Sequence, residues 1–129
     1  TKDASAFLEV TFPLKWIKEN PNFLELIPKT SETILSSTVK KQFEINEDWL
    51  SANWSGVCDL LQKVTKPSLI ITGIEDEAVP SGNSLILVDK IPGSWLVQIE
   101  GAGHGLMYQY PKTFTEIVET FLNVSETIR

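Results

Sequence analysis

The stretch Leu69–Leu106, LIITGIEDEAVPSGNSLILVDKIPGSWLVQIEGAGHGL, decides the fold of this chain. At its start lies the apolar run Ser68–Thr72, which begins one residue earlier and has the length of a strand covered on both faces. A second apolar run, Trp95–Ile99, predicts another strand, and Pro80 and Pro92 bound a helical pattern between the two. Strand, helix and strand form a βαβ unit, so we expect parallel strands joined by a right-handed crossover.

An acid and the chain's single histidine follow these two strands. Asp76 comes after the first strand, within Glu75–Glu77, and His104 comes after the second, within Gly101–Gly105. Because parallel strands end at the same edge of a sheet, we expect the two side chains to meet there. They would form the base and the acid of a catalytic arrangement that also needs a nucleophile. The glycines are expected to leave room for the imidazole to approach a nucleophile.

Two other interpretations of these residues stay open. A lone histidine in a loop is more often structural than catalytic, and the order strand, acid, helix, strand, histidine is what favours the catalytic one. A metal site at Glu75–Glu77 with His104 is disfavoured, because it offers one imidazole and no regular ligand spacing. We therefore expect no metal and no cofactor.

Two helical patterns accompany the strands. Between the strands, Leu85, Val88 and Ile91 are expected to face inward. After Pro111, a final helix has the clearest apolar period of the chain, at Phe114, Ile117, Val118, Phe121 and Leu122. A parallel sheet needs more than two strands and helices on both faces. Further strands are therefore expected from the rest of a larger domain, or from a second copy that pairs edge to edge.

Residues 1–56 have a helical period, are broken by prolines and contain no convincing strand. A short helix is expected to stop at Asn20–Pro21. A second helix, Ile34–Phe43, is expected to bury one face, and Asn46 is expected to cap a third helix that carries Trp49. After residue 56 the pattern changes, and a short amphipathic helix leads into the first strand.

Composition bounds the class of protein. The chain has 129 residues, enough for one domain, and a formal charge of −6 with 11 scattered basic residues. Without a basic stripe, nucleic acid and anionic membranes are poor partners. The single cysteine, Cys58, forms no internal disulfide. No run of about 18 apolar residues and no signal peptide are present, so we expect a cytoplasmic protein.

Several segments together resemble the C-terminal third of an α/β-hydrolase. They are Lys66–Pro80, Ile91–Trp95 and Gly101–His104, and Trp54–Leu61 is similar to the end of that family's cap and the helix that follows it. The resemblance implies an α/β fold with few parallel strands flanked by helices and preceded by an all-helical cap. Residues 1–56 would form the cap, and residues 57–129 would form the C-terminal part of the core.

The resemblance also implies roles for the two candidate site residues. Asp76 matches the acid of the family's triad, and His104 matches its general base, which takes a proton from a serine at a Gly-x-Ser-x-Gly turn. No such turn occurs in this chain, and in the family it lies before the cap. The chain is therefore expected to be the C-terminal fragment of a serine hydrolase of the esterase or lipase kind, inactive by itself.

The expected substrate of the parent protein is a small apolar ester. Trp16, Trp49 and Met107 are the candidate substrate contacts, although aromatic residues at helical spacing are ordinarily core. An alternative from another class of function is a truncated, non-catalytic hydrolase that acts as a self-associating or ligand-binding module. The unpaired sheet edge motivates that alternative.

Overall fold

The computed structural model describes residues 8–25, 35–51 and 56–127. The helices and strands follow in the order α2 (Leu14–Glu19), η1 (Phe23–Glu25), α3 (Ser36–Leu50), η2 (Cys58–Lys63), β1 (Leu69–Gly73), α4 (Gly82–Lys90), β2 (Trp95–Ile99), α5 (Leu106–Gln109) and α6 (Pro111–Thr127), where η marks a 3₁₀ helix. In the described part of the chain, the sheet has two strands.

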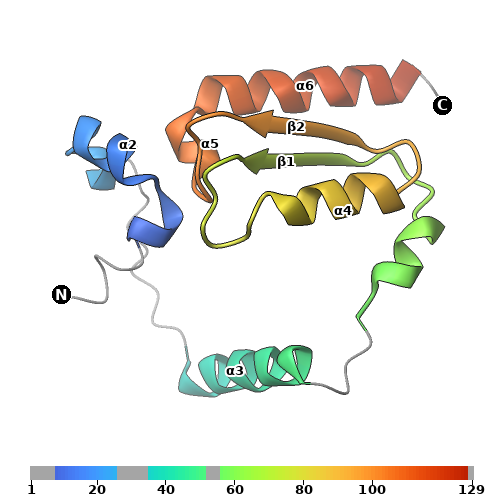
Figure 1. The fold of residues 1–129 in the computed structure, drawn as a ribbon, viewed down its shortest axis with the longest axis horizontal. Helices are drawn as coiled ribbons and strands as arrows, with labels where there is room; N and C mark the ends of the chain where they lie inside the picture. Colours follow the sequence, from blue (N-terminus) through green and yellow to red (C-terminus); the bar gives the residue numbers. More distant parts are fainter. Residues whose placement is uncertain (1–7, 26–34, 52–55, 128–129) are drawn as a thin grey trace.

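The two strands form the predicted parallel pair. Their register runs from Leu69 opposite Trp95 to Gly73 opposite Ile99. In Figure 1 the strands lie between α6 and α4, and both arrows point toward α5 and α2. The α/β class expected from the sequence is confirmed, and the carboxyl ends of both strands lie at one edge of the sheet.

One edge of β1 has no strand beside it among the described residues. Trp95 N donates to Ser68 O at 2.9 Å, and Ile74 N donates to Ile99 O at 3.0 Å. Backbone groups alternate in direction along a strand, so the even-numbered residues of β1 face β2. The peptide groups of Leu69 and Ile71 therefore point away from β2.

The helices that flank the sheet follow the apolar period with one change of phase. On α6 the predicted positions are half-buried except Leu122, and Phe121 lies 5.5 Å from Trp95 between ring centroids. On α4 the prediction for Leu85 is wrong, since that residue is 51% exposed. The inward face consists of Ser84, Leu87 and Val88, with Ile91 directly after the helix, and these residues are spaced as one helical stripe. Leu85 follows Ser84 by one residue and therefore points about 100° away from this stripe.

The amino-terminal helices confirm one expectation and correct two. Helix α2 ends at Asn20, as predicted. Helix α3 runs through Asn46 without a break, so the predicted cap there is wrong, because no proline or glycine interrupts the segment and asparagine costs under about 1 kcal/mol inside a helix. The predicted buried face of this helix is also wrong. Phe43 is 66% exposed, and α3 lies apart from the sheet in Figure 1.

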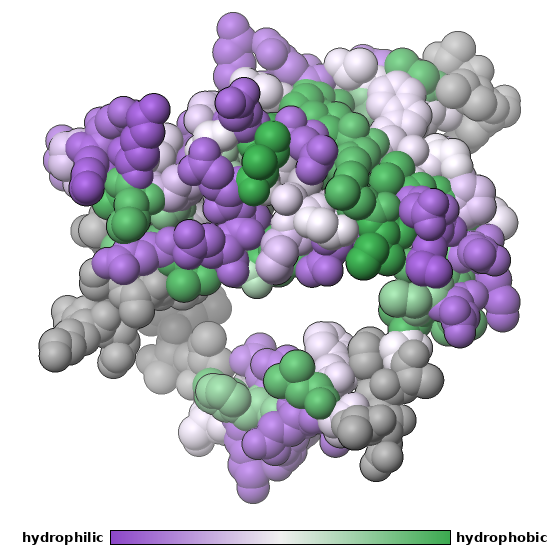
Figure 2. Space-filling model, in the orientation of Figure 1, coloured by the Kyte–Doolittle hydropathy of each residue, from purple (hydrophilic) through white to green (hydrophobic). Residues whose placement is uncertain are grey.

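Apolar side chains remain at the surface of the sheet layer as well. Figure 2 shows an apolar band across the part of the molecule that holds the strands and α4. On α4, Leu85 and Ile86 are each about half exposed. None of the helices in the described ranges is long and apolar enough to cross a membrane.

Candidate active site

Asp76 and His104 form a pair at the carboxyl edge of the sheet. His104 Nδ1 lies 3.0 Å from Asp76 Oδ2, with the imidazole 50% exposed and the carboxylate 7% exposed. An ionised carboxylate only accepts hydrogen bonds, so the pairing places the proton on Nδ1 and leaves a lone pair on Nε2 of the neutral ring. The flanking Glu75 and Glu77 are exposed. Among the described residues, Asp76 is the acid whose carboxylate contacts the imidazole.

The carboxylate is oriented by the backbone that follows it. Asp76 Oδ1 accepts from Val79 N at 2.8 Å, while Oδ2 faces the imidazole. We call Gly73–Pro80 the acid loop and Gly101–Gly105 the histidine loop. Glu75 N donates to Ala102 O at 2.9 Å, which ties the two loops together. The pair is therefore held by side-chain and main-chain contacts alike.

Gly73 allows the two loops to approach this closely. A Cβ atom at this position would collide with the carbonyl group of Ala102 and would lie 2.6 Å from Gly103 O. Ala102 itself is fully buried. Any larger residue at Gly73 would push the histidine loop away from the acid loop.

One glycine of the histidine loop leaves room for an amino-terminal side chain. Gly105 N donates to Thr11 O at 2.8 Å, and the Phe12 ring fills the space in which a Cβ of Gly105 would lie. Phe12 is 2% exposed and stacks on Trp16 with ring centroids 5.1 Å apart. The room beside Gly105 is thus occupied by an amino-terminal side chain, which sequence periodicity could not indicate.

Gln109 is a second contact that the sequence did not single out. Its side chain accepts from Gly103 N at 2.7 Å and donates to Gly101 O at 3.2 Å. The residue is 9% exposed. A polar residue between Tyr108 and Tyr110 carries no pattern that would mark it beforehand.

A hollow of about 290 Å³ lies beside the pair. Its walls include Asp76, His104 and Met107, so one of the three expected substrate contacts lines the candidate site. Trp16 stacks on Phe12, whose ring lies against Gly105 of the histidine loop, and does not line this hollow. Trp49 is 58% exposed, and its hollow is lined by residues of α3 alone. The structure therefore does not bring Trp49 to the pair.

A hydroxyl group also lines this hollow. Ser84 is 8% exposed, but no hydrogen bond joins its side chain to His104 in the described part of the chain. It lies inside helix α4 and not in a turn between a strand and a helix, which is where the serine of a Gly-x-Ser-x-Gly motif lies. In the same described ranges, no three His, Cys, Asp or Glu residues are grouped to hold a metal ion.

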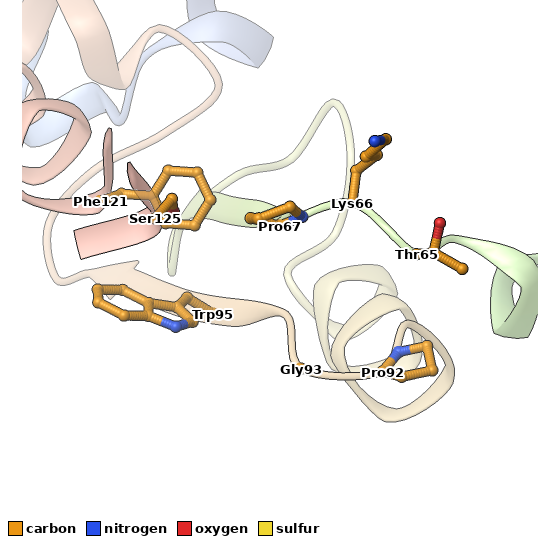
Figure 3. A pocket seen from close by; sticks show the side chains of 8 residues that line it. All are labelled: Thr65, Lys66, Pro67, Pro92, Gly93, Trp95, Phe121 and Ser125. Atoms are coloured by element: carbon orange, nitrogen blue, oxygen red, sulfur yellow. The ribbon is translucent and has the colours of Figure 1, made fainter. Parts of the chain in front are cut away.

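A larger hollow, of about 590 Å³, lies at the opposite end of the strands (Figure 3). Its walls combine Pro67, Pro92, Trp95 and Phe121 with the polar residues Thr65, Lys66 and Ser125. Lys66 reaches away from Trp95 in Figure 3, and no carboxylate, imidazole or thiol is among the lining side chains. The smaller hollow is the candidate active site because it holds the paired acid and histidine.

Comparisons with known proteins relate the part of the chain that holds this pair to known hydrolases. The family model described as TAP-like protein matches residues 41–127, which include both Asp76 and His104. A solved structure described as "Est816 as an N-Acyl homoserine lactone degrading enzyme" has a TM-score of 0.60 and 25% identity, and the match covers 90% of this chain and 45% of that one.

Two curated relatives are similar over shorter shares of their length. An uncharacterised protein of Mycobacterium tuberculosis is 28% identical over 108 residues, which are 82% of this chain and 31% of that protein. A 2-hydroxy-6-oxo-6-(2'-aminophenyl)hexa-2,4-dienoic acid hydrolase of Metapseudomonas resinovorans is 31% identical over 65 residues, which are 50% of this chain and 22% of that protein. The chain thus spans less than a third of either relative.

Proposed function

This chain belongs to the TAP-like family of the α/β-hydrolase superfamily, and on that premise we propose that it supplies the acid and the general base of a serine hydrolase. The observation that carries the proposal is the 3.0 Å contact between His104 Nδ1 and Asp76 Oδ2. The serine and the oxyanion hole come from a part of the protein outside this chain. By itself, the chain is inactive in acyl transfer.

The pair acts through Nε2 of His104. Nε2 takes the proton of the serine hydroxyl as its oxygen bonds to the acyl carbon, and it then gives that proton to the leaving oxygen as the acyl bond breaks. In the second half of the reaction, Nε2 takes a proton from water as the water oxygen bonds to the acyl carbon. It then gives that proton to the serine oxygen as the acid product is released. Asp76 holds the Nδ1–H throughout and stabilises the imidazolium that forms between the two transfers.

The proposed substrate is a small apolar ester or lactone. Met107 and the apolar walls beside the pair favour such an acyl group, and the structural relative is described as an enzyme that degrades N-acyl homoserine lactone. Among the expected substrate contacts, the geometry favours Met107. Trp16 is proposed to act indirectly by supporting Phe12, and Trp49 has no place in this hollow.

The nucleophile is proposed to arrive with an added strand on the free edge of β1. The peptide groups of Leu69 and Ile71 point to that edge, and exposed apolar residues of α4 adjoin the layer. The match to 45% of the lactone-degrading structural relative leaves the larger part of that protein to supply strands. A parallel strand there would satisfy the free N–H and C=O groups.

Complementation tests this function directly. The chain is coexpressed with the part of the structural relative that it does not match, and the purified assembly is treated with an activated ester and a fluorophosphonate probe. We expect ester turnover and a labelled serine on the added part, with turnover lost in His104→Ala. An assembly that forms and labels, but turns over equally with His104→Ala, would contradict the proposal.

The purified chain alone provides the complementary measurement. We expect no fluorophosphonate labelling, because no hydrogen bond joins a serine side chain to His104 among the described residues. Labelling that disappears in Ser84→Ala would reveal a nucleophile inside the chain and overturn the division of the active site.

A second candidate function is a self-associating, non-catalytic module, which the unpaired edge of β1 favours. Two copies would then pair through Leu69 and Ile71. Sedimentation of the purified chain separates the candidates, because a compact monomer at all concentrations contradicts self-pairing.

A further inference from the structure

We propose that Gln109 is a positioning residue for His104, acting through both ends of its side-chain amide. The inference rests on the proposed function, since a positioned imidazole matters to a hydrolase. It adds a third residue to the pair, located at the end of α5 and five positions after the histidine. Gln109 does not touch the reacting atoms, and its effect passes through the histidine loop.

The amide of Gln109 holds the loop on both sides of Ala102. Oε1 accepts from Gly103 N at 2.7 Å, and Nε2 donates to Gly101 O at 3.2 Å. The peptide group of Gly103 lies directly before His104, so its position limits where the imidazole can be. The loop is thereby fixed from the side that faces α5.

The same segment is fixed to the acid loop from its other side. Ala102 O accepts from Glu75 N at 2.9 Å, one residue before Asp76. The connection from Gln109 to Asp76 therefore consists of successive hydrogen bonds and short stretches of backbone. It determines how closely His104 approaches the carboxylate.

Burial makes these two bonds matter. Gln109 is 9% exposed, and Gly103 and Ala102 are buried, so water cannot readily replace the amide. Among the described residues, Gln109 is the side chain that accepts from Gly103 N. The Tyr110 hydroxyl lies 3.5 Å from Gly101 O and could substitute only at that carbonyl. Loss of the amide leaves a buried donor unpaired, which the loop can relieve only by moving.

A purely structural role would lower stability without changing the histidine. NMR on the full chain separates the two roles. It measures the hydrogen-exchange rate of His104 Nδ1–H and the chemical shift of the Gly103 amide. Gln109→Met keeps the length of the side chain and removes its polar atoms. Gln109→Glu keeps an acceptor for Gly103 N and loses the donor to Gly101 O. Gln42→Met, at an exposed position on α3, is the matched control.

We expect Nδ1–H exchange to be about tenfold faster in Gln109→Met, the size of effect that the loss of the buried bond to Gly103 N produces, since the Tyr110 hydroxyl can replace the bond at Gly101 O. Gln109→Glu should recover most of this loss, and Gln42→Met should match the parent chain. Should Gln109→Met fail to fold, Gln109→Asn, whose amide is one methylene shorter, is expected to give the same fast exchange. Unchanged exchange in the folded variants would overturn the positioning role.

The outcome is independent of the nucleophile. Nδ1–H exchange in Gln109→Met that is no faster than in the parent chain overturns this inference and leaves the acid and base roles standing. Absence of His104-dependent turnover in the complemented assembly contradicts the proposed function and leaves the NMR result unaffected.

Discussion

His104 Nδ1 and Asp76 Oδ2 lie 3.0 Å apart although 28 positions separate the two residues in the chain. The parallel pairing of β1 with β2 causes this proximity, because each residue follows the carboxyl end of its strand. Gly73 then allows the acid loop to lie directly against Ala102. The pair therefore depends on the parallel strands and on glycine at position 73, where a side chain would keep the two loops apart.

Asp76→Asn should impair turnover in the complemented assembly. The amide keeps the bond from Val79 N but loses the charge that stabilises the imidazolium, so we expect kcat to fall by about 10²–10⁴. Steady-state ester hydrolysis measures the change. Glu77→Gln, an exposed neighbour, should leave kcat within twofold or so of the parent; an equal fall there would move the acid role away from Asp76.

Gly73→Ala should destabilise the chain through a backbone clash. The added Cβ would meet the Ala102 carbonyl, so we expect a loss of about 2 kcal/mol or more in the free energy of unfolding. Gly82→Ala is the matched control, because nothing lies within 4 Å of its Cβ and alanine favours the helix. Urea unfolding compares them, and equal stabilities would contradict the close approach of the two loops.

Phe12→Ala should detach the amino-terminal segment from the histidine loop. Phe12 is 2% exposed, so truncation should cost about 3–5 kcal/mol. Phe43→Ala, at a position 66% exposed, should change stability by about 0.5 kcal/mol or less. Thermal unfolding reports the difference, and the Gly105 amide should shift only in the first variant. A Phe12→Ala chain as stable as Phe43→Ala would exclude this packing.

Met107→Ala should weaken the binding of an apolar ester in the complemented assembly. Met107 lines the hollow beside His104, so we expect KM to rise by about tenfold while kcat changes little. Trp49→Ala should leave KM unchanged because Trp49 lies on α3, outside this hollow. A larger effect at Trp49 than at Met107 would reverse the assignment of the substrate contact.

Ile71→Pro should block an added strand without opening the existing pair. The Ile71 N–H points to the free edge, so proline removes a donor that β2 does not use. Ile70→Pro removes a donor that faces β2 and should unfold the sheet. Sedimentation of the complemented assembly measures strand addition, and circular dichroism checks the fold. Unimpaired assembly with folded Ile71→Pro would refute pairing at this edge.

The sequence was sufficient for the βαβ unit and for the location of the acid and histidine. Apolar runs of strand length, prolines and a long amphipathic period are local signals, and they predicted β1, β2 and α6. The phase of α4 was not a local signal. Leu85 was expected to face inward but is 51% exposed, and its neighbour Ser84 is buried instead, because the orientation of a helix depends on the surface against which it packs.

The Asp76–His104 pair thus depends both on the order of residues in the chain and on contacts made by the folded chain. The sequence by itself determined that Asp76 and His104 follow successive parallel strands, because strand order and direction follow from the spacing of apolar runs. Only the tertiary structure decided which residues hold them in place. Phe12 comes from a distant part of the chain, and Gln109 comes from a four-residue helix that no apolar period in the sequence predicted. Such contacts depend on distances between loops, which residue order does not encode locally.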